Sequence, residues 1–498
     1  MSHPHSMHAP GIPLVVQVGF AGSRILFDAA AHPGLDALKF EREIEDHLTA
    51  ILEALPETLG LAKKHFLCGI SQIAIGADTL FTRACARLGI SQRIFLSQHR
   101  DAYLAAKCDN GTPDFTEAQA AVALELLKGS HIIEDRVVSD SPERDQRFED
   151  VNVEVVRVSD IVIALRRENA DGKPGGTMDL IDRARARKRT VLEIIVSVQD
   201  GHAHFRDEWH PAHPKQKQSG DASFTLPGVP EVLAHFQHEG ETGFAMKLKK
   251  FTSDKAGRHQ AFFKFAALII IGTHVGATVL AVSGLLFDHH FEHSHGLLLG
   301  CELGLLLGGL LTHMLLHRTE AVEHWATGRL ISEIARSVNA IGGVRGYLHH
   351  LFLLPLPEGI RPVLRTLNVF HLKATRNLPD GQWSARCAAY VRDRLDDPLR
   401  GQISYYAKAR ASARRWMRVA RCVFYTGSCL AILGTLVKLL HEKKVGPPAM
   451  LHAIEEPIGP WLSFIAIVLP VIAVAALSFA VSLDLQARDH TNGEMLEA

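Results

Sequence analysis

Three glycine-containing turns carry the residues best suited to hold an anionic ligand. They are Gly19-Phe-Ala-Gly-Ser-Arg24, Ile75-Gly-Ala-Asp78 and Gly175-Gly-Thr177. Glycine lets backbone N–H groups approach a phosphate closely, and a helix that begins beside such a turn favours an anion at its N-terminus. The Arg24 guanidinium suits a phosphate or a carboxylate, and Asp78 and Asp179 could accept ribose hydroxyls. These residue types predict a pocket for a nucleotide-type ligand.

Each of these residues also has a purely structural interpretation. A glycine after a strand is often only a turn, so a single turn is weak support, whereas three turns on one sheet are stronger. Asp78 could instead cap the helix that follows it, and Arg24 could form a surface ion pair. The sequence leaves both alternatives open.

The turns need a scaffold, and residues 14–199 alternate between strand and helix patterns. Strands are expected over 14–18, 70–75, 93–96, 161–165 and 190–196, with helices over 36–55, 78–88, 116–128 and 178–188. This alternation predicts a mostly parallel sheet covered on both faces. Ligands bind such sheets beyond the carboxyl ends of the strands, so the three turns should lie together.

Composition excludes several classes of protein. The chain has 498 residues, with 54 Lys+Arg against 54 Asp+Glu, and this balance argues against a nucleic-acid partner recruited by overall charge. None of the seven cysteines forms a C-x-x-C pair, which argues against structural zinc or a disulfide framework. The polar, His/Pro-rich residues 1–13 lack the pattern of a signal peptide.

Four apolar runs follow in the second half of the chain. They cover residues 265–287, 296–316, 422–437 and 461–483. About 20 apolar residues span a bilayer, so four transmembrane helices in two hairpins are expected. The alternative is a set of buried core helices, which the short third run leaves most open.

Basic residues before the third run set the expected topology. They are Lys408, Arg410, Arg414, Arg415, Arg418 and Arg421. The positive-inside rule places this side in the cytoplasm, where contact with anionic lipid is also expected. The N-terminal domain, the middle region and the C-terminus then share that side, and residues 288–295 and 438–460 form the outer loops.

Two polar residues interrupt the second run. At about 100° per residue, Glu302 and His313 share one face with Gly309, while Gly296, Gly300, Gly304 and Gly308 form a separate stripe suited to close helix packing. Charged residues inside a bilayer usually face protein or water. Glu302 and His313 are therefore expected to face a bundle interior or a pore, or else to form an interhelical hydrogen bond without conduction. The His-rich loop 288–295 is interpreted as a solvated turn rather than a metal site.

The N-terminal motifs resemble a known superfamily. GFAGSR, IAIGADTLFTRACARLG, FLSQHRDAY, DF, RFEDVNVEVVRVSDIVIAL and KPGGTMDLIDRARARKRTVLEI occur in this order over residues 14–199. They resemble the Rossmann-like SLOG superfamily, which includes Smf/DprA and the LOG nucleotide hydrolases, and most closely its nucleotide-sensor branch found beside membrane helices in bacterial conflict systems. The resemblance implies a pocket lined by Gly19, Gly22, Ser23, Arg24, Gly76, Ala77, Asp78, Asn152, Asp160, Gly175, Gly176, Thr177 and Asp179, with Tyr103 nearby.

This sequence departs from the LOG hydrolases where their chemistry is done. Asn152 stands where those enzymes carry an arginine. Their glycine motif ends in a glutamate, whereas here it is shortened to PGGT and Asp179 is the nearest acid. Binding without turnover is therefore favoured, and no catalytic residue is assigned. A membrane-tethered nucleotide or N-glycosidic hydrolase remains the alternative, with Asp78 or Asp179 as its general acid or base. A transporter or scaffold is less favoured, because no pair of inverted halves is visible.

The middle region resembles the SLATT family of two-transmembrane effectors, through YVRDRL at 390–395, QISYYAKA at 402–409 and HWATGRLISEIAR at 324–336. The expected parts are a tail (1–13), a SLOG-like nucleotide-binding domain (14–199), a linker (200–250), an amphipathic entry helix with the first hairpin (251–317), a cytosolic SLATT-like region (318–421), the second hairpin (422–484) and a C-terminal tail (485–498).

Together these observations predict a ligand-gated membrane effector in the bacterial inner membrane. A nucleotide or NAD-derived signal would bind the Rossmann-like domain and gate or assemble a pore in a homo-oligomer, with antiphage defence implied by the resemblance alone. The expected partners are the nucleotide-type ligand and the lipid bilayer, with no nucleic acid, resident cofactor or metal.

Overall fold

A computed structural model of the chain describes residues 11–107, 113–169, 172–212, 228–286, 295–343, 359–378, 383–396, 401–442 and 459–483, with a few isolated positions between and after them. The chain forms two compact units. Residues up to 248 together with 334–380 make the first unit, and residues 249–333 with 381–498 make the second. Most of the predicted N-terminal tail, of the two outer loops and of the C-terminal tail lies outside the described residues. Residues 11–13 of the predicted tail are described, and Ile12 is buried, so this end of the tail packs against the first unit.

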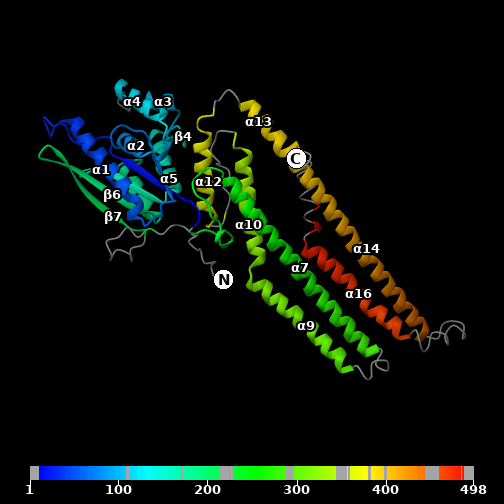
Figure 1. Cartoon of the computed structure of the whole chain (residues 1–498). Helices are drawn as coiled ribbons and strands as arrows, with labels where there is room; N and C mark the ends of the chain where they lie inside the picture. Colours follow the sequence, from blue (N-terminus) through cyan, green and yellow to red (C-terminus); the bar gives the residue numbers. More distant parts are fainter. Residues whose placement is uncertain are drawn as a thin grey trace. The chain divides into compact units, whose positions relative to one another are not determined.

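A seven-stranded sheet forms the centre of the first unit (Figure 1). Its strands are β1 (Val15–Gly22), β2 (Phe66–Ser71), β3 (Ser91–Leu96), β4 (Ile132–Val137), β5 (Ile161–Arg167), β6 (Thr190–Gln199) and β7 (His202–His210). They lie in the order β4-β3-β2-β1-β5-β6-β7, and only the β6–β7 pair is antiparallel. After β4 the chain returns to β5 on the other side of β1, so the order reverses between β1 and β5.

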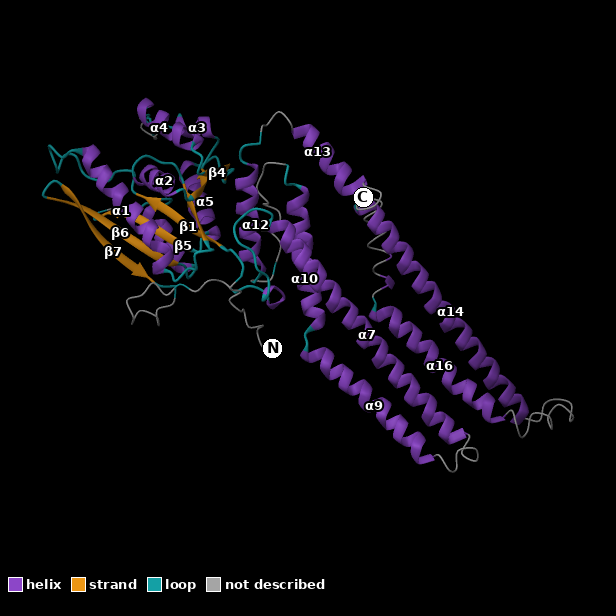
Figure 2. Ribbon diagram, viewed as in Figure 1, coloured by secondary structure: helices purple, strands orange, loops and turns teal. Residues whose placement is uncertain are grey.

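Helices cover both faces of this sheet (Figure 2). They are α1 (Ala37–Thr58), α2 (Ala77–Leu88), α3 (Arg100–Leu104), α4 (Glu117–Lys128), α5 (Arg144–Val158) and α6 (Thr177–Ala186). Successive side chains of a strand point to opposite faces. Ile161 and Ile163 of β5 accordingly pack in the core with α1 and α2, while Val162 and Ala164 pack with α5 and α6. The predicted Rossmann-like α/β class is confirmed.

Two strands were not expected from the sequence. β4 carries Glu134, Asp135 and Arg136, whose charges hide the strand pattern. β7 falls within the segment that the sequence indicated to be a linker. Its Ala203, Phe205 and Trp209 are half-buried against the core of α1 and α2, and its His- and acid-rich composition obscures this alternation. The strand expected over 70–75 begins earlier, at Phe66, and ends at Ser71.

A helix from the predicted middle region belongs to the first unit. Helix α12 (Ile360–Thr375) is mostly buried, and it contacts β1 and β4. Val15 donates its backbone N–H to Thr366 Oγ1 at 3.1 Å, and Arg376 donates to the carbonyl of Ser130 at 2.6 Å. The compact unit therefore combines residues far apart in the chain.

The second unit contains four helices long and apolar enough to cross a membrane. The helices that lie wholly or mostly in this unit are α7 (Phe244–Leu286), α9 (His295–Arg318), α10 (Ala321–Ala340), α13 (Trp383–Val391), α14 (Gln402–Glu442) and α16 (Gly459–Ser482). A short helical turn follows α13 over Arg392–Asp396. α7, α9, α14 and α16 are the four candidate spans, which confirms the predicted number.

Contacts between small residues pair these spans into two hairpins. An added Cβ at Gly276 would lie 3.1 Å from Leu305, and one at Gly309 would lie 2.6 Å from Thr273 Oγ1, so α7 and α9 run antiparallel. Gly427 and Gly434 of α14 meet α16 in the same antiparallel manner. Small residues allow this close approach of helices.

Candidate functional site

The turns after β1 and β2 are joined by backbone contacts. The Gly22 N–H donates to Asp78 Oδ1 at 3.1 Å, and the Ala77 N–H donates to the carbonyl of Ser23 at 3.2 Å. An added Cβ at Gly22 would lie 2.1 Å from Ala77 Cβ, and Gly76 has φ +81°. Both positions therefore require glycine. The predicted convergence of these two turns is seen in the structure.

Asp78 holds the two turns together from a buried position. Its side chain lies in the first turn of α2, and the residue is 4% exposed. Burial raises the pKa of Asp78 to about 7, although the hydrogen bonds from the Gly22 and Ala74 backbones and the charge of Arg24 act in the opposite direction. The helix-cap alternative does not describe this residue, because the N-cap of α2 is Gly76.

Two arginines meet at one carboxylate beside this turn. Arg24 donates to Asp114 Oδ1 at 3.3 Å and to the Asp114 carbonyl at 2.8 Å. Arg144 donates to both carboxylate oxygens of Asp114, at 2.9 and 2.8 Å. The side chain of Asp114 is 4% exposed, whereas those of Arg24 and Arg144 are 36% and 23% exposed. Two guanidinium groups thus converge on the carboxylate of Asp114.

One face of α5 connects this cluster to the third turn. Arg144, Phe148 and Asn152 recur every four residues and therefore share a helix face. The Arg144 guanidinium lies 5.3 Å from the centre of the Phe148 ring, and an added Cβ at Gly175 would lie 2.6 Å from Phe148 Cβ. Asn152 Nδ2 donates to the carbonyl of Gly176 and to Asp179 Oδ2, both at 3.0 Å. α5 therefore brings the third turn to the same edge of the sheet.

Two helices begin at this edge with glycine caps. Gly76 precedes α2 and Gly176 precedes α6, whose first residue is Thr177. Glycine has no side chain with which to cap the N–H groups of the first turn. Both helix N-termini also carry positive partial charge. The edge between β1 and β5, where the strand order reverses, is the location at which open α/β sheets bind ligands.

Two predicted pocket residues lie elsewhere. Gly19 is in the middle of β1, where an added Cβ would lie 2.3 Å from Ser159 Oγ, so its role there is close packing. Asp160 precedes β5 at the amino edge of the sheet. It accepts the Gln17 N–H at 3.0 Å and pairs with Arg365 of α12. Neither residue is brought to the edge that holds the three turns.

Sequence reasoning missed Asp114, Arg144 and Phe148 as parts of this cluster. The four-residue spacing of Arg144, Phe148 and Asn152 was a usable signal, because it places all three on one face of a helix. No local pattern connects Asp114 to Arg24 across 90 residues. Tyr103, expected nearby, is buried beside this cluster, and its ring contacts that of Phe115.

The polar residues of α9 occupy different surroundings. Gly309 is buried against Thr273 and His274 of α7, and Glu302 is half-buried on that side of the helix. His313 is exposed, with its ring 4.7 Å from that of His317. A Cβ added at Gly300, Gly304 or Gly308 would contact no other part of the described chain within 4 Å, so this stripe is open.

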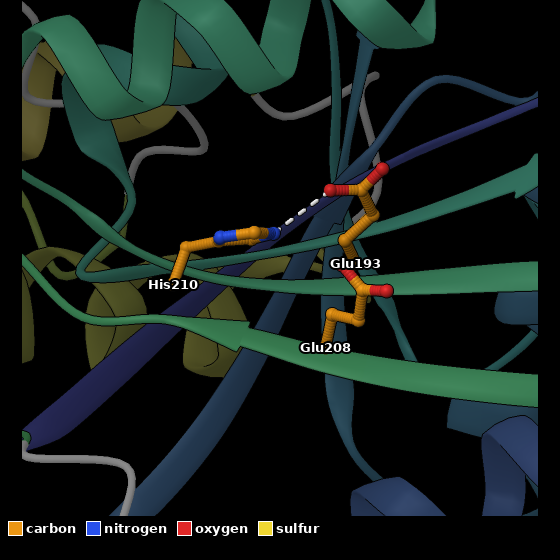
Figure 3. A group of neighbouring side chains, drawn as sticks. All are labelled: Glu193, Glu208 and His210. Carbon is orange, nitrogen blue, oxygen red and sulfur yellow. Dashed lines mark hydrogen bonds and ion pairs between the residues drawn. The ribbon is translucent and has the colours of Figure 1, made fainter. Parts of the chain in front are cut away.

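A second polar cluster lies on strands β6 and β7 (Figure 3). His210 Nε2 lies 2.8 Å from Glu193 Oε2, and Glu208 is close enough for the three to surround a metal ion. Arg166 and Arg185 pair with Glu193 at 2.6 and 3.2 Å, however, and Arg206 pairs with Glu208 at 2.9 Å. Burial would raise the pKa of Glu193, but hydrogen bonds from Arg166 and His210 hold it below the ordinary value. The cluster is best described as an ion-pair network that anchors β7.

Comparisons with known proteins assign no family to this chain and find one weak structural likeness. No family model matches the chain, and no curated protein does. Among solved structures, DNA processing protein A (DprA) from Streptococcus pneumoniae aligns at 16% identity with a TM-score of 0.24. The alignment covers 38% of this chain and 53% of that chain, about half of its length. The N-terminal unit is Rossmann-like by its own strand order, and the second unit carries the four candidate membrane helices.

Proposed function

We propose that this protein is a membrane effector that senses a nucleotide-type ligand. One observation carries the proposal: Arg24 and Arg144 share the single carboxylate of Asp114 at the edge where the strand order reverses. The same chain continues into four helices that can cross a membrane. A ligand-binding unit covalently joined to membrane helices is suited to convert a cytosolic signal into a change in the membrane.

The charge of the edge favours an anionic ligand. Two partly exposed guanidinium groups compete for one buried carboxylate, so a phosphate could take over part of their hydrogen bonding. The glycine-capped starts of α2 and α6 add N–H groups that suit further phosphate oxygens. A diphosphate or dinucleotide, such as an NAD-derived signal, has two phosphates. It therefore matches the arginine pair together with the helix N-termini better than a monophosphate does.

The hydrogen bonds of the two carboxylates near the edge support binding without turnover. Asp78 accepts the Gly22 N–H, and Asp179 accepts both Asn152 and Arg183. Each acid is already engaged in holding a turn. Asn152, which replaces the arginine of the LOG hydrolases, donates to the third turn rather than presenting a charge to a ligand.

A hydrolase is the second candidate, and the pKa of Asp78 favours it. A carboxyl whose pKa is about 7 can exchange a proton at neutral pH, as a general acid or base must. Incubating the full-length protein with NAD and ADP-ribose and following product formation separates the two candidates. Turnover that Asp78→Asn abolishes would favour the hydrolase, whereas binding without product favours the sensor.

Thermal unfolding of the full-length protein in detergent tests the sensor directly. NAD, ADP-ribose and cyclic dinucleotides are the probes, and at least one should raise the unfolding temperature of the N-terminal unit. Arg24→Gln and Arg144→Gln should remove this shift, because each deletes a cation at the edge. Arg87→Gln is the matched control, since Arg87 also pairs with an aspartate, Asp46, but lies on the exposed side of α2. A shift that survives both edge variants contradicts the proposed site.

The output is proposed to be permeabilisation of the bacterial inner membrane by a homo-oligomer, with both termini in the cytoplasm. The stripe of Gly300, Gly304 and Gly308 offers α9 a face for close packing against another helix. Ion flux into liposomes that contain the protein, with and without the stabilising ligand, measures gating. Unchanged conductance and selectivity in Glu302→Gln would remove Glu302 from the pore.

A further inference from the structure

The second unit encloses a cavity that the proposed function does not use. Its volume is about 530 Å³, which lies within the usual range of ligand sites. Segments of α7, α10 and α14 and the residues just after α16 surround it. The lining residues that matter for its chemistry are Lys264, Trp325, Arg329, Tyr405, Trp416 and Leu483.

The cavity lies where apolar spans give way to polar helix. Lys264 directly precedes the apolar run of α7, and Trp416 lies six residues before the run that begins at Cys422 of α14. Leu483 directly follows α16. Tryptophan, tyrosine and lysine concentrate at the boundary between a bilayer and water, because each combines an apolar body with a polar end. The cavity is therefore at the depth of lipid headgroups.

The charged part of the lining is basic. Lys264 and Arg329 line the cavity, and among the described lining residues there is no aspartate or glutamate. Arg329 Nη2 lies 3.2 Å from the Tyr405 hydroxyl and 2.8 Å from Glu333, which is outside the lining. These contacts hold the guanidinium at the wall of the cavity, while Lys264 supplies a second positive charge.

The remaining wall is uncharged, and most of it is apolar or aromatic. Trp325 and Trp416 contribute indole rings, and Leu483 and Leu485 contribute aliphatic side chains. Trp416 is 52% exposed, although it lies among helices that pack together. A ligand with an anionic head and an apolar body matches this division, whereas a free anion would leave the aromatic wall uncovered.

We propose that this cavity binds one anionic phospholipid. Its phosphate contacts Lys264 and Arg329, and its glycerol and upper acyl carbons pack against Trp416 and Leu483. Basic pockets between membrane helices on the cytoplasmic side bind such headgroups. The lipid joins segments of both hairpins, so anionic lipid stabilises the arrangement of α7, α10 and α14.

Native mass spectrometry of the full-length protein tests the preference. The protein is released from membranes that contain equal amounts of phosphatidylglycerol and phosphatidylcholine, and the retained lipids are counted. We expect about 30-fold more retained phosphatidylglycerol, the effect of two basic contacts near the membrane surface. Equal retention of the two lipids by the wild-type protein overturns the proposal, and this readout needs no variant.

Variants then locate the site. The double variant Lys264→Gln, Arg329→Gln should bring the ratio close to one. The matched control is Arg418→Gln, Arg421→Gln, which removes the same charge from exposed positions of α14 outside the lining. Loss of the preference in the control but not in the cavity variant would place the lipid on the basic helix surface and overturn the proposal. Should the double variant fail to fold, Trp416→Ala should lower retention of phosphatidylglycerol, and unchanged retention counts against the site.

A final arm separates a lipid from a free anion. Delipidated protein in neutral detergent is heated with phosphatidylglycerol, with glycerol 3-phosphate or with inorganic phosphate. Only the lipid should raise the unfolding temperature. Equal stabilisation by inorganic phosphate would identify a simple anion site and contradict the proposed lipid.

Discussion

At the scale of single residues, buried polar groups hold the candidate site in shape. Asp78 joins the turns after β1 and β2 by accepting the Gly22 N–H, and Asn152 joins α5 to the third turn. Both residues are nearly inaccessible to solvent, with 4% and 1% exposure. An unsatisfied group in such a position is costly, so these residues determine the geometry that a ligand meets.

The raised pKa of Asp78 predicts a specific dependence of stability on pH. Its folded-state pKa of about 7 lies above the ordinary value of 3.8, so the folded protein binds the proton more tightly. This contribution is complete below pH 4 and is lost as the pH rises through about 7. Asp78→Asn keeps an acceptor but cannot ionise. The free energy of unfolding of the variant should therefore rise relative to that of the wild type as the pH increases from 5 toward 8. The gain is up to about 1.4 kcal/mol per pH unit, and it levels off above the folded-state pKa.

Thermal unfolding of the N-terminal unit in the full-length protein measures this difference. Asp78→Ala is the companion variant, since it removes the acceptor and should be less stable than Asp78→Asn at every pH. Parallel curves for the wild type and Asp78→Asn across pH 5 to 8 would contradict the assignment of the raised pKa.

Gly175 should tolerate substitution less well than another glycine with similar backbone angles. Gly175 and Gly89 have φ of +71° and +64°, so alanine at either position is strained by about 1–2 kcal/mol. The added Cβ at Gly175 would also lie 2.6 Å from Phe148 Cβ, whereas an added Cβ at Gly89 would meet no described atom within 4 Å. Gly175→Ala should therefore cost about 1–3 kcal/mol more than Gly89→Ala in denaturant unfolding. Equal costs would show that the turn moves freely away from α5.

At the scale of elements, α12 is the main addition to the expected architecture. The helix packs at the amino edge of the sheet, where Arg365 pairs with Asp160 and Thr366 accepts the Val15 N–H. The carboxylate of Asp160 is 5% exposed, so its charge needs this partner. A fragment that ends near residue 200 would lack α12 and expose that edge.

Removing the partner of Asp160 should be strongly destabilising. Arg365→Met leaves a buried carboxylate uncompensated, and the expected cost is about 3–5 kcal/mol. Arg361→Met on the same helix is the control, because Arg361 is exposed and its loss should change stability by less than about 0.5 kcal/mol. Hydrogen exchange of β1 in the full-length protein reports the effect locally. Equal exchange in the two variants would mean that α12 does not stabilise the sheet.

At the scale of the whole molecule, the candidate membrane helices present apolar surface that the described part of the chain leaves exposed. Leu297, Leu303 and Leu311 of α9 are 72%, 58% and 64% exposed. Soluble monomers rarely expose contiguous apolar surface of this kind, and a bilayer or a second copy of the chain would cover it. Apolar surface of this kind fits the four helices that are long and apolar enough to cross a membrane.

Cysteine accessibility tests the proposed topology. All seven native cysteines are first replaced, and single cysteines are then introduced at Asp288 in the expected outer loop and at Thr319 between α9 and α10. A membrane-impermeant maleimide added to intact cells should label the first position and leave the second unlabelled until the cells are lysed. The reverse pattern would invert the proposed orientation.

The amino-acid sequence by itself determined the elements whose signal is local. Alternating and continuous apolar runs indicated β1, β3, β5 and β6, and long uncharged runs indicated all four spans, because burial against helices and exposure to lipid each select apolar residues over a contiguous segment. Glycines after strands indicated three turns of the candidate edge. These signals depend on neighbouring residues and need no knowledge of distant contacts.

Only the tertiary structure decided what depends on distant partners. It placed α12 at the amino edge of the sheet, paired Arg24 and Arg144 with Asp114, and moved Asp160 to the edge opposite the three turns. Each of these contacts joins residues separated by tens to hundreds of positions, so no local period encodes them. Charged segments such as β4 and β7 were hidden for a related reason: their charges are satisfied by partners on other strands and helices, and composition alone does not show those partners.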